Sequence, residues 1–171
     1  MKKKGEIMDI LEQLYEKYSL PLYRFLLSLT GSAQDAEELL QETFYQALKG
    51  IDRFEGRCSS YTWLCQIGKN IWCKELNKRK RFYKQPIEEM ELSKEERLLE
   101  QMVKQEERQH LRKAVWNLKE PYREIVMLHI YGENSLKEIG VSFGKSESWA
   151  RVTFYRAKQM LTEQMRREET E

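Results

Sequence analysis

Residues 135–157 read SLKEIGVSFGKSESWARVTFYRA, and this stretch decides the fold. Ser135, followed three residues later by Glu138, is a capping box that predicts the start of a short helix over residues 136–143. A Gly-Lys pair then makes a tight turn, and Ser146 is placed to cap a longer helix. A short helix, a glycine turn and a longer helix are together the pattern of a helix-turn-helix.

The longer helix has one apolar face and one basic face. The small and apolar residues whose helical spacing predicts the buried face are Ala150, Phe154, Ala157 and Leu161. The residues expected to point outward, toward a DNA major groove, are Ser148, Arg151, Val152, Tyr155 and Arg156. Arginine suits this position because it can bond guanine through two hydrogen bonds and can also bind phosphate. The alternative at this point is an ordinary helical hairpin with a solvated basic face.

Composition agrees with a helical protein built from small modules. The 171 residues include only 8 Gly and 3 Pro, too few for a turn-rich all-β fold. With 40% hydrophobic and 34% charged residues, small modules with large surfaces are favoured over one thick globule. No apolar run approaches the roughly 18 residues that a membrane span needs, and the start lacks the apolar segment of a signal peptide. We therefore expect a cytoplasmic protein without membrane insertion.

The charges form blocks of alternating sign, although 30 bases against 28 acids give a net charge of only +2. Residues 32–52 sum to −4, and residues 53–84, with nine bases and two acids, sum to +7. Residues 85–110 sum to −4 and residues 141–167 to +4. Two basic blocks separated by an acidic one indicate a protein that binds a polyanion, unless the bases only solvate helix faces.

Apolar spacing predicts three helices before the middle of the chain. The first covers residues 6–29, with a break expected near Ser19 because Pro21 suits the first turn of a new helix. Ser32 is the expected N-cap of the second helix, whose first turns are acidic. The third helix ends in strongly basic sequence, after which Pro86 and Glu-rich residues with weak periodicity predict a linker.

Aromatic side chains are interleaved with the basic block. They are Phe54, Tyr61, Trp63, Trp72, Phe82 and Tyr83. Basic grooves with aromatic faces, on which bases stack, hold single-stranded nucleic acid. Some of these aromatics can instead be core residues, and we expect this of Trp63, which precedes Leu64 on the apolar stripe.

Four motifs in sequence order are similar to those of bacterial sigma factors of the extracytoplasmic-function (ECF) type, in the sigma-70 family. They are Asp35–Phe44, Tyr61–Leu64 with Ile67 and Asn70, Leu118–Glu124 with Ser135–Gly140, and Tyr155–Lys158. The resemblance covers nearly the whole chain. It implies an all-α fold of two small helical domains joined by a flexible acidic linker, the second domain being a helix-turn-helix domain. The boundaries we expect are 6–83, 84–105 and 106–167.

The resemblance also implies a function: binding core RNA polymerase and directing promoter-specific transcription initiation. Core-polymerase-binding residues would be Asp35, Glu38, Gln41 and Glu42. Residues that melt and hold the minus-ten element would be Tyr61, Lys69, Asn70, Lys74, Lys78, Arg79 and Arg81. The five outward residues of the helix-turn-helix would read the minus-thirty-five element. Partners would be the polymerase and promoter DNA, both duplex and melted, while an anti-sigma factor, common in the family, is left open.

The chain departs from the family pattern at a few positions. Trp149 and Ala150 stand where Thr and Val are common, and Val152 where Ser is frequent. Gly140 replaces the usual Ala, and Asn134 stands where an apolar residue is common. These departures leave the fold prediction unchanged, but Val152 bears on the minus-thirty-five preference because it lies on the expected DNA face.

The sequence favours a binding protein over an enzyme. It shows no nucleophile with an adjacent base and no glycine-rich phosphate loop. Cys58, Cys65 and Cys73 lack metal-site spacing, so we expect reduced thiols, no metal, no cofactor and no small-molecule ligand. The competing binding functions are a stand-alone helix-turn-helix transcriptional regulator, which should act as a dimer without polymerase, and an adaptor that binds only protein.

Overall fold

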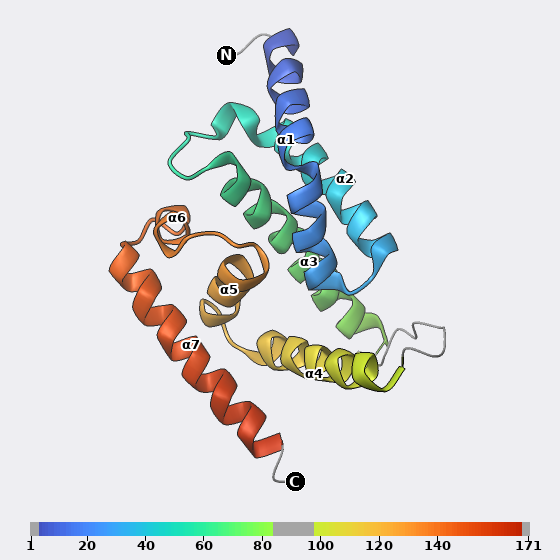
Figure 1. Cartoon of the computed structure of the whole chain (residues 1–171). Helices are drawn as coiled ribbons and strands as arrows, with labels where there is room; N and C mark the ends of the chain where they lie inside the picture. The colour runs from blue at the N-terminus through green and yellow to red at the C-terminus, as the bar shows by residue number, and fades with distance from the viewer. Residues whose placement is uncertain (1–3, 84–97, 169–171) are drawn as a thin grey trace.

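The computed structural model describes residues 4–83 and 98–168, with side chains described for residues 4–81 and 106–168. All regular structure in these residues is helical, which confirms the predicted all-α class. The elements are α1 (Lys4–Thr30), α2 (Ala33–Gly50), the 3-10 turn η1 (Ile51–Arg53), α3 (Ser60–Tyr83), α4 (Leu98–Asn117), α5 (Tyr122–Val126), the π-helical turn η2 (Met127–Tyr131), α6 (Leu136–Ser142) and α7 (Glu147–Glu168) (Figure 1).

Helices α1, α2 and α3 pack together in the first half of the chain (Figure 1). Leu22, Phe25 and Leu26 of α1 are buried, and Leu26 lies against α3 at Gly68. Gly68 of α3 lies so near to Leu26 and Thr43 that a Cβ atom would meet them at 2.8 and 3.0 Å. Close packing at this point sets the distance between α3 and its neighbours.

Helix α1 is continuous through Pro21, so the break predicted near Ser19 is wrong. Proline removes one intrahelical hydrogen bond and crowds the preceding turn. Pro21 is exposed, and so is Lys17, the residue whose carbonyl group loses its intrahelical partner. Apolar residues on both sides of it, Leu11 and Leu22, are buried, and this tertiary packing outweighs the local preference for a break.

The second half contains α4, three short helical elements and α7. Predicted helix starts are confirmed at Ser135, whose Oγ accepts from the Glu138 amide at 3.1 Å, and at Ser146, whose Oγ accepts from the Trp149 amide at 3.1 Å. Ser32 caps α2 in the same way. Gly144 lies in the turn between α6 and α7 and has a φ of +64°, a backbone angle that residues with a side chain rarely adopt.

Helix α4 begins earlier than predicted. The linker was expected over residues 84–105, but α4 starts at Leu98, inside that range. Leucine, glutamate, glutamine and lysine, which make up most of residues 98–105, are all good helix formers. Residues 84–97 lie outside the described part of the chain, so the rest of the linker prediction is not tested.

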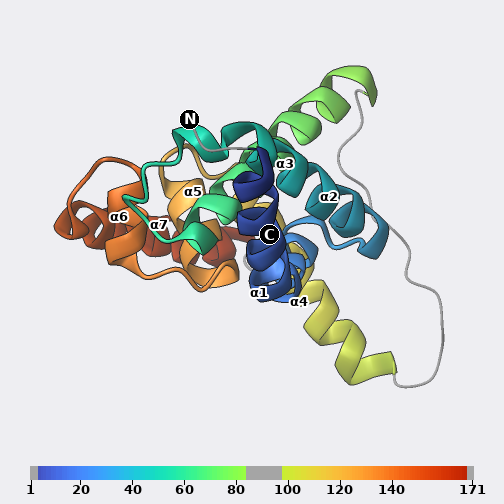
Figure 2. The same cartoon turned by 90° about the horizontal axis from the view of Figure 1, so that it is seen from above.

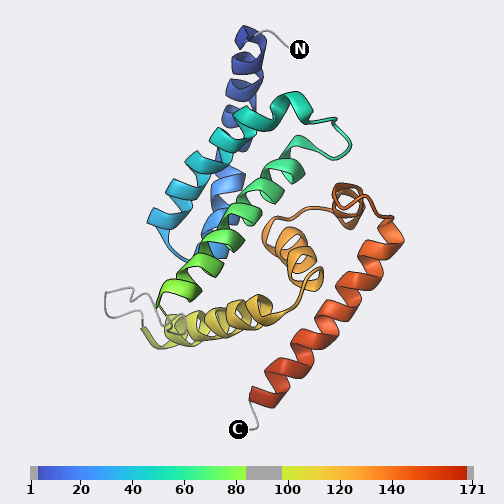
Figure 3. The ribbon, with the colours of Figure 1, turned by 180° about the vertical axis from the view of Figure 1, so that it is seen from behind.

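The two halves are in contact along α3. In the view from behind, α5 and η2 lie between α3 and α7 (Figure 3). Seen from above, α6 and α7 lie at one end of the molecule and the basic C-terminal end of α3 projects at the other (Figure 2). Buried apolar side chains of both halves, among them Phe25, Leu64, Leu128 and Ile139, belong to one continuous core.

Candidate nucleic-acid and polymerase interfaces

The outer face of α7 carries all five residues predicted to read the minus-thirty-five element. Ala150, Thr153 and Ala157 are buried and orient the helix. Predicted contact residues that are exposed on the other side are Ser148, Arg151, Val152, Tyr155 and Arg156. Arg151 is held by an ion pair to Glu147 at 2.5 Å, one helical turn earlier. The face therefore combines two cations with two apolar side chains, the mixture that base-edge and phosphate contacts need.

Gly140 and Trp149 set the angle between α6 and α7. A Cβ atom on Gly140 would meet the Ser146 carbonyl oxygen at 2.8 Å, so only glycine fits without a shift of the turn. Trp149 is half-buried and packs against Phe143, with ring centroids 5.5 Å apart. These two departures from the family pattern thus lie inside the hairpin, and of the departures on α7 only Val152 faces outward.

Helix α3 divides the residues predicted for the minus-ten element between two faces. The first face borders a cleft of about 730 Å³ between α2, η1 and α3. Asn70, Lys74 and Lys78 line this cleft, and all three residues are exposed. Phe54 and Trp63 stack in the cleft wall with ring centroids 4.5 Å apart and an angle of 21°. Trp63 is half-buried: as expected it packs against the hydrophobic core, and its remaining exposed part lines the cleft.

Two further residues line the cleft, and one of them, Arg53, is not among the predicted site residues. Arg53 lines the cleft from η1, and Glu42, predicted to bind polymerase, lines it from α2. The Glu42 carboxylate accepts a hydrogen bond from Gln46, another cleft residue, at 2.6 Å. The sequence shows that Arg53 belongs to the basic block. Its location at the cleft depends on the conformation of η1, which the spacing of apolar residues does not indicate.

The second face of α3 is covered by the other half of the chain. Lys69, predicted to contact DNA, is 1% exposed, and its Nζ contacts Oε1 of Glu124 on α5. Three more polar contacts follow along α3: Ser59 N to Glu138 Oε2 at 2.7 Å, Thr62 Oγ1 to Asn134 Oδ1 at 2.8 Å, and Gln66 Nε2 to Ser142 Oγ at 3.0 Å. In this arrangement, Lys69 is not accessible to nucleic acid. We call this set of contacts the α3 seam.

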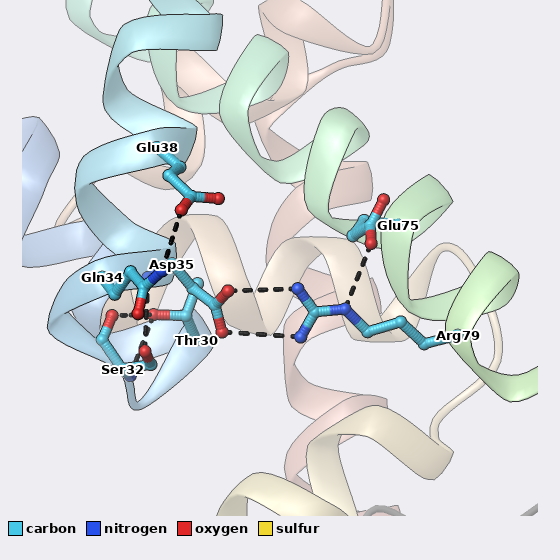
Figure 4. A network of polar contacts seen from close by, with 7 residues as sticks. All are labelled: Thr30, Ser32, Gln34, Asp35, Glu38, Glu75 and Arg79. Carbon is cyan, nitrogen blue, oxygen red and sulfur yellow. Dashed lines mark hydrogen bonds and ion pairs between the residues drawn. The ribbon is translucent and has the colours of Figure 1, made fainter. Parts of the chain in front are cut away.

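Asp35 and Arg79, predicted to bind different partners, bind each other (Figure 4). The guanidinium of Arg79 contacts the Asp35 carboxylate at 3.0 and 3.5 Å and Glu75 at 3.1 Å. The hydrogen bond to Asp35 raises the pKa of Arg79 above its already high value, which keeps the group charged. This bridge ties the end of α3 to the start of α2. Arg81, predicted with Arg79, is exposed on α3.

The other predicted polymerase contacts lie on the exposed side of α2. Glu38 and Gln41 are exposed, and they share a helical face with Tyr45 and Leu48, which are 51% and 39% exposed. Exposed large apolar side chains beside polar and charged ones are typical of a protein-binding surface.

The cysteines and the half-buried tyrosine lie near the α3 seam. All three cysteines are free thiols. Burial raises the pKa of the Cys65 thiol to about 12, and its neighbours are Asn134 and Tyr61. Burial also raises the pKa of Tyr61, whose ring lies 5.6 Å from that of Tyr18. Tyr61, predicted to meet the minus-ten strand, is thus half-buried beside α1.

No helix in the part of the chain that the structure describes is long and apolar enough to cross a membrane. Within the same residues, no group of three or more His, Cys, Asp or Glu side chains could hold a metal ion.

Known proteins match the chain over most of its length. The family described as Sigma-70 region 2 matches residues 14–82. The RNA polymerase sigma factor YlaC of Bacillus subtilis (strain 168) is 30% identical over 165 residues, which is 92% of each chain. The ECF RNA polymerase sigma factor SigM of the same organism is 29% identical over 158 residues, 88% of this chain and 92% of SigM.

A solved structure has the same fold. It is the sigma factor RpoE in complex with the anti-sigma factor NepR from Bartonella quintana, with a TM-score of 0.61 and 23% identity. The match covers 91% of this chain and 96% of that one.

These matches, together with the helix-turn-helix half, define a class of proteins that start transcription. The chain belongs to the sigma-70 family and is an RNA polymerase sigma factor of the ECF type. It directs transcription initiation by RNA polymerase and is not an enzyme in its own right, as the sequence predicts.

Proposed function

We propose that this sigma factor reads the minus-thirty-five element with the outer face of α7. The observation that carries the proposal is the division of α7 into a buried side and an exposed side bearing the five predicted residues. Arg151 and Arg156 supply contacts to guanine or phosphate. Val152 and Tyr155, which are 49% and 58% exposed, suit apolar contact with thymine methyl groups.

The cleft between α2 and α3 is the proposed site for the melted minus-ten strand. Its stacked Phe54 and Trp63 give an aromatic face for an unpaired base, and Asn70 gives a donor and an acceptor for base edges. Lys74, Lys78 and Arg53 would attract the phosphates. Base stacking and phosphate contacts together would offset the cost of unstacking, which is on the order of a few kcal/mol. We extend the predicted set by Arg53 and Phe54.

The exposed face of α2 is the proposed surface for core RNA polymerase. Glu38 and Gln41 would provide its polar contacts, and Tyr45 and Leu48 its apolar ones. Asp35 supports this surface from within, because its carboxylate is engaged by Arg79. Acidic character would also keep this face away from DNA and direct it to basic protein surface.

The proposed function also indicates where the protein works in the cell and a further partner that it binds. We place the protein in the cytoplasm, where bacterial RNA polymerase works. An anti-sigma factor is a reasonable further partner, since the solved relative RpoE was found in complex with one.

The proposed function predicts that the protein and core polymerase open DNA only together. The experiment is permanganate footprinting, which detects unpaired thymines, on the DNA upstream of the gene that encodes this chain. Core polymerase with the protein should give reactive thymines near minus ten, and neither component alone should do so. Failure of the protein to co-elute with core polymerase, combined with an unreactive footprint, would overturn the proposal. Binding to the same DNA as a dimer without polymerase would favour a stand-alone regulator.

A further inference from the structure

Glu147 and Arg151 form an ion pair at the start of the helix that is proposed to read duplex DNA. Two nitrogens of Arg151, Nε and Nη2, donate to the same oxygen of Glu147, Oε1, at 3.1 and 2.5 Å. The residues are one helical turn apart, so their side chains lie on the same side of α7. The Glu147 side chain is 40% exposed and that of Arg151 65%, so both are open to a ligand. Figure 1 shows this end of α7 beside α6.

The ion pair leaves a definite set of hydrogen-bonding groups free. Arginine has five N–H donors in a planar fork, and two of those of Arg151 are used by Glu147. The end of the fork, formed by Nη1 and Nη2, keeps donors for a second partner. Within the described residues, the other carboxylate oxygen of Glu147, Oε2, has no hydrogen-bond partner. The pair therefore presents two neighbouring donors and, beside them, one acceptor.

One base pair in one orientation complements this order of groups in the DNA major groove. A G·C pair presents two acceptors, N7 and O6 of guanine, and then one donor, N4–H of cytosine. An A·T pair presents an acceptor, a donor and an acceptor in either orientation. Guanine O6 and cytosine N4 are joined by a hydrogen bond of about 2.9 Å. The atoms that join Arg151 to Glu147 are similarly close, so the spacing of the groups fits as well as their order.

The location of the pair on α7 favours contact with bases. In helix-turn-helix proteins, the first residues of the recognition helix contact base edges. Glu147 is the first residue of α7, where the partial positive charge of the helix end favours a carboxylate.

Arg156 differs from Arg151 in its surroundings. It is exposed, and it has no ion-pair or hydrogen-bond partner in the part of the chain that the structure describes. It also lies about 140° around the helix axis from Arg151. An arginine that no neighbour orients suits phosphate, which can be bound from many directions and carries no sequence information.

We propose that Glu147 is a specificity-determining residue for the minus-thirty-five element: it holds Arg151 on guanine, accepts from cytosine N4–H, and so selects a G·C pair at one position. The inference rests on the proposed function and deepens it, because it assigns the base contact to Arg151 and a phosphate contact to Arg156. Each of the other three base pairs places an acceptor, adenine or guanine N7 or thymine O4, against the Glu147 carboxylate. This repulsion is the unfavourable contact that specificity needs.

Selection of DNA by the polymerase holoenzyme tests this assignment. The DNA is the region upstream of the gene that encodes this chain, with the minus-thirty-five element randomised, and the bound fragments are sequenced. The wild-type protein should enrich G·C over the other three pairs at one position by about 5- to 100-fold, the selectivity of a good two-bond contact. Glu147→Gln replaces the carboxylate with an amide, which donates as well as accepts. It should lower the preference by about tenfold at that position alone.

Three further variants separate base reading from general effects of charge and stability. Arg151→Ala should lose the preference at the same position as Glu147→Gln. Arg156→Ala should weaken binding to all sequences alike. Glu163→Gln is the matched control, because it breaks an ion pair of the same spacing, with Arg167, about 24 Å further along α7. Its base preferences should equal those of the wild type.

The salt dependence of holoenzyme binding to unrelated duplex DNA gives a second readout. In the wild-type protein, Glu147 keeps Arg151 from the phosphates. In Glu147→Gln, Arg151 should gain one phosphate contact, and the slope of log K against log salt concentration should steepen by about 0.9. Fluorescence anisotropy measures this slope, and a pair that only stabilises α7 would leave it unchanged.

Several results would overturn the role of Glu147. They are an unchanged sequence profile or salt slope in Glu147→Gln, a loss of the same size at every position, and losses in Glu147→Gln and Arg151→Ala that fall on different positions. A wild-type holoenzyme that enriches no sequence at the minus-thirty-five element would instead overturn the proposed function, and with it the inference.

Discussion

Gly140 is the residue on which the helix-turn-helix geometry depends most directly. Gly140→Ala should lower the free energy of unfolding by about 1–3 kcal/mol, because the added methyl group meets the backbone of Ser146 at 2.8 Å. Urea unfolding followed by circular dichroism measures this. Gly5→Ala is the matched control, since nothing lies within 4 Å of its added Cβ. Equal effects of the two substitutions would contradict the close approach of α6 and α7.

The bridge between Asp35 and Arg79 predicts energetic coupling. Asp35→Asn and Arg79→Gln should each lower the free energy of unfolding by about 0.5–1 kcal/mol, since the pair is partly exposed to solvent. The double variant should lose less than the sum, because each single change already breaks the same contact. Losses that simply add would show that the two side chains act separately, as the sequence alone predicts.

The role of Asn134 could not be predicted from the sequence. The sequence marks it as a polar residue at a position where an apolar one is common. Its role depends on Thr62, which lies 72 positions earlier in the chain, and no local pattern connects the two. Lys69 is similar: in sequence it is one more base in a basic block, and only the approach of Glu124 buries it.

At the scale of elements, α7 gives the sharpest prediction for DNA. Arg151→Ala with Arg156→Ala should weaken binding to the minus-thirty-five element by about 10- to 100-fold, because both side chains are exposed on the outer face of α7. Binding to core polymerase should be unchanged, since its proposed surface is on α2. Fluorescence anisotropy with duplex DNA measures the first and co-elution the second. Arg166→Ala with Arg167→Ala removes the same charge from the far end of the helix and should cost less than about threefold. Loss of core binding in the first variant would contradict the division of tasks between the two halves.

The cleft beside α3 predicts selectivity for DNA with an unpaired minus-ten strand over fully paired DNA. Phe54→Leu removes the stacked ring and should weaken binding of polymerase holoenzyme to a fork with an unpaired minus-ten strand by about tenfold. Fully paired DNA of the same sequence, which offers no unpaired base, is the control and should bind as before. An equal loss on both DNAs would show that Phe54 supports the fold and does not hold the strand.

Helical periodicity predicted most elements, and its errors share a cause. It placed the capping residues Ser32, Ser135 and Ser146 correctly, because capping is a local interaction. It predicted a break in α1 near Ser19 that is absent, and it did not predict that Trp63, which packs against the core, also lines a cleft. Both depend on tertiary packing, since neighbouring helices decide whether a proline is tolerated and which half of an aromatic ring is covered.

For the whole molecule, the sequence predicted two helical halves and not their contact. The alternating charge blocks suggested separate tasks for each half. The seam joins residues 59–69 to residues 124–142, and it is made of single polar side chains with no shared sequence pattern. Such a contact becomes visible only when both halves are folded and placed together.

Run-off transcription with bacterial core polymerase tests the central claim most directly. The template is the DNA upstream of the gene that encodes this chain, and the samples are core alone, core with the wild-type protein, and core with the Arg151→Ala and Arg156→Ala variant. We predict a discrete transcript with the wild-type protein, a weaker one with the variant and none with core alone. A wild-type protein that produces no transcript would contradict the account, and so would a variant that matches the wild type.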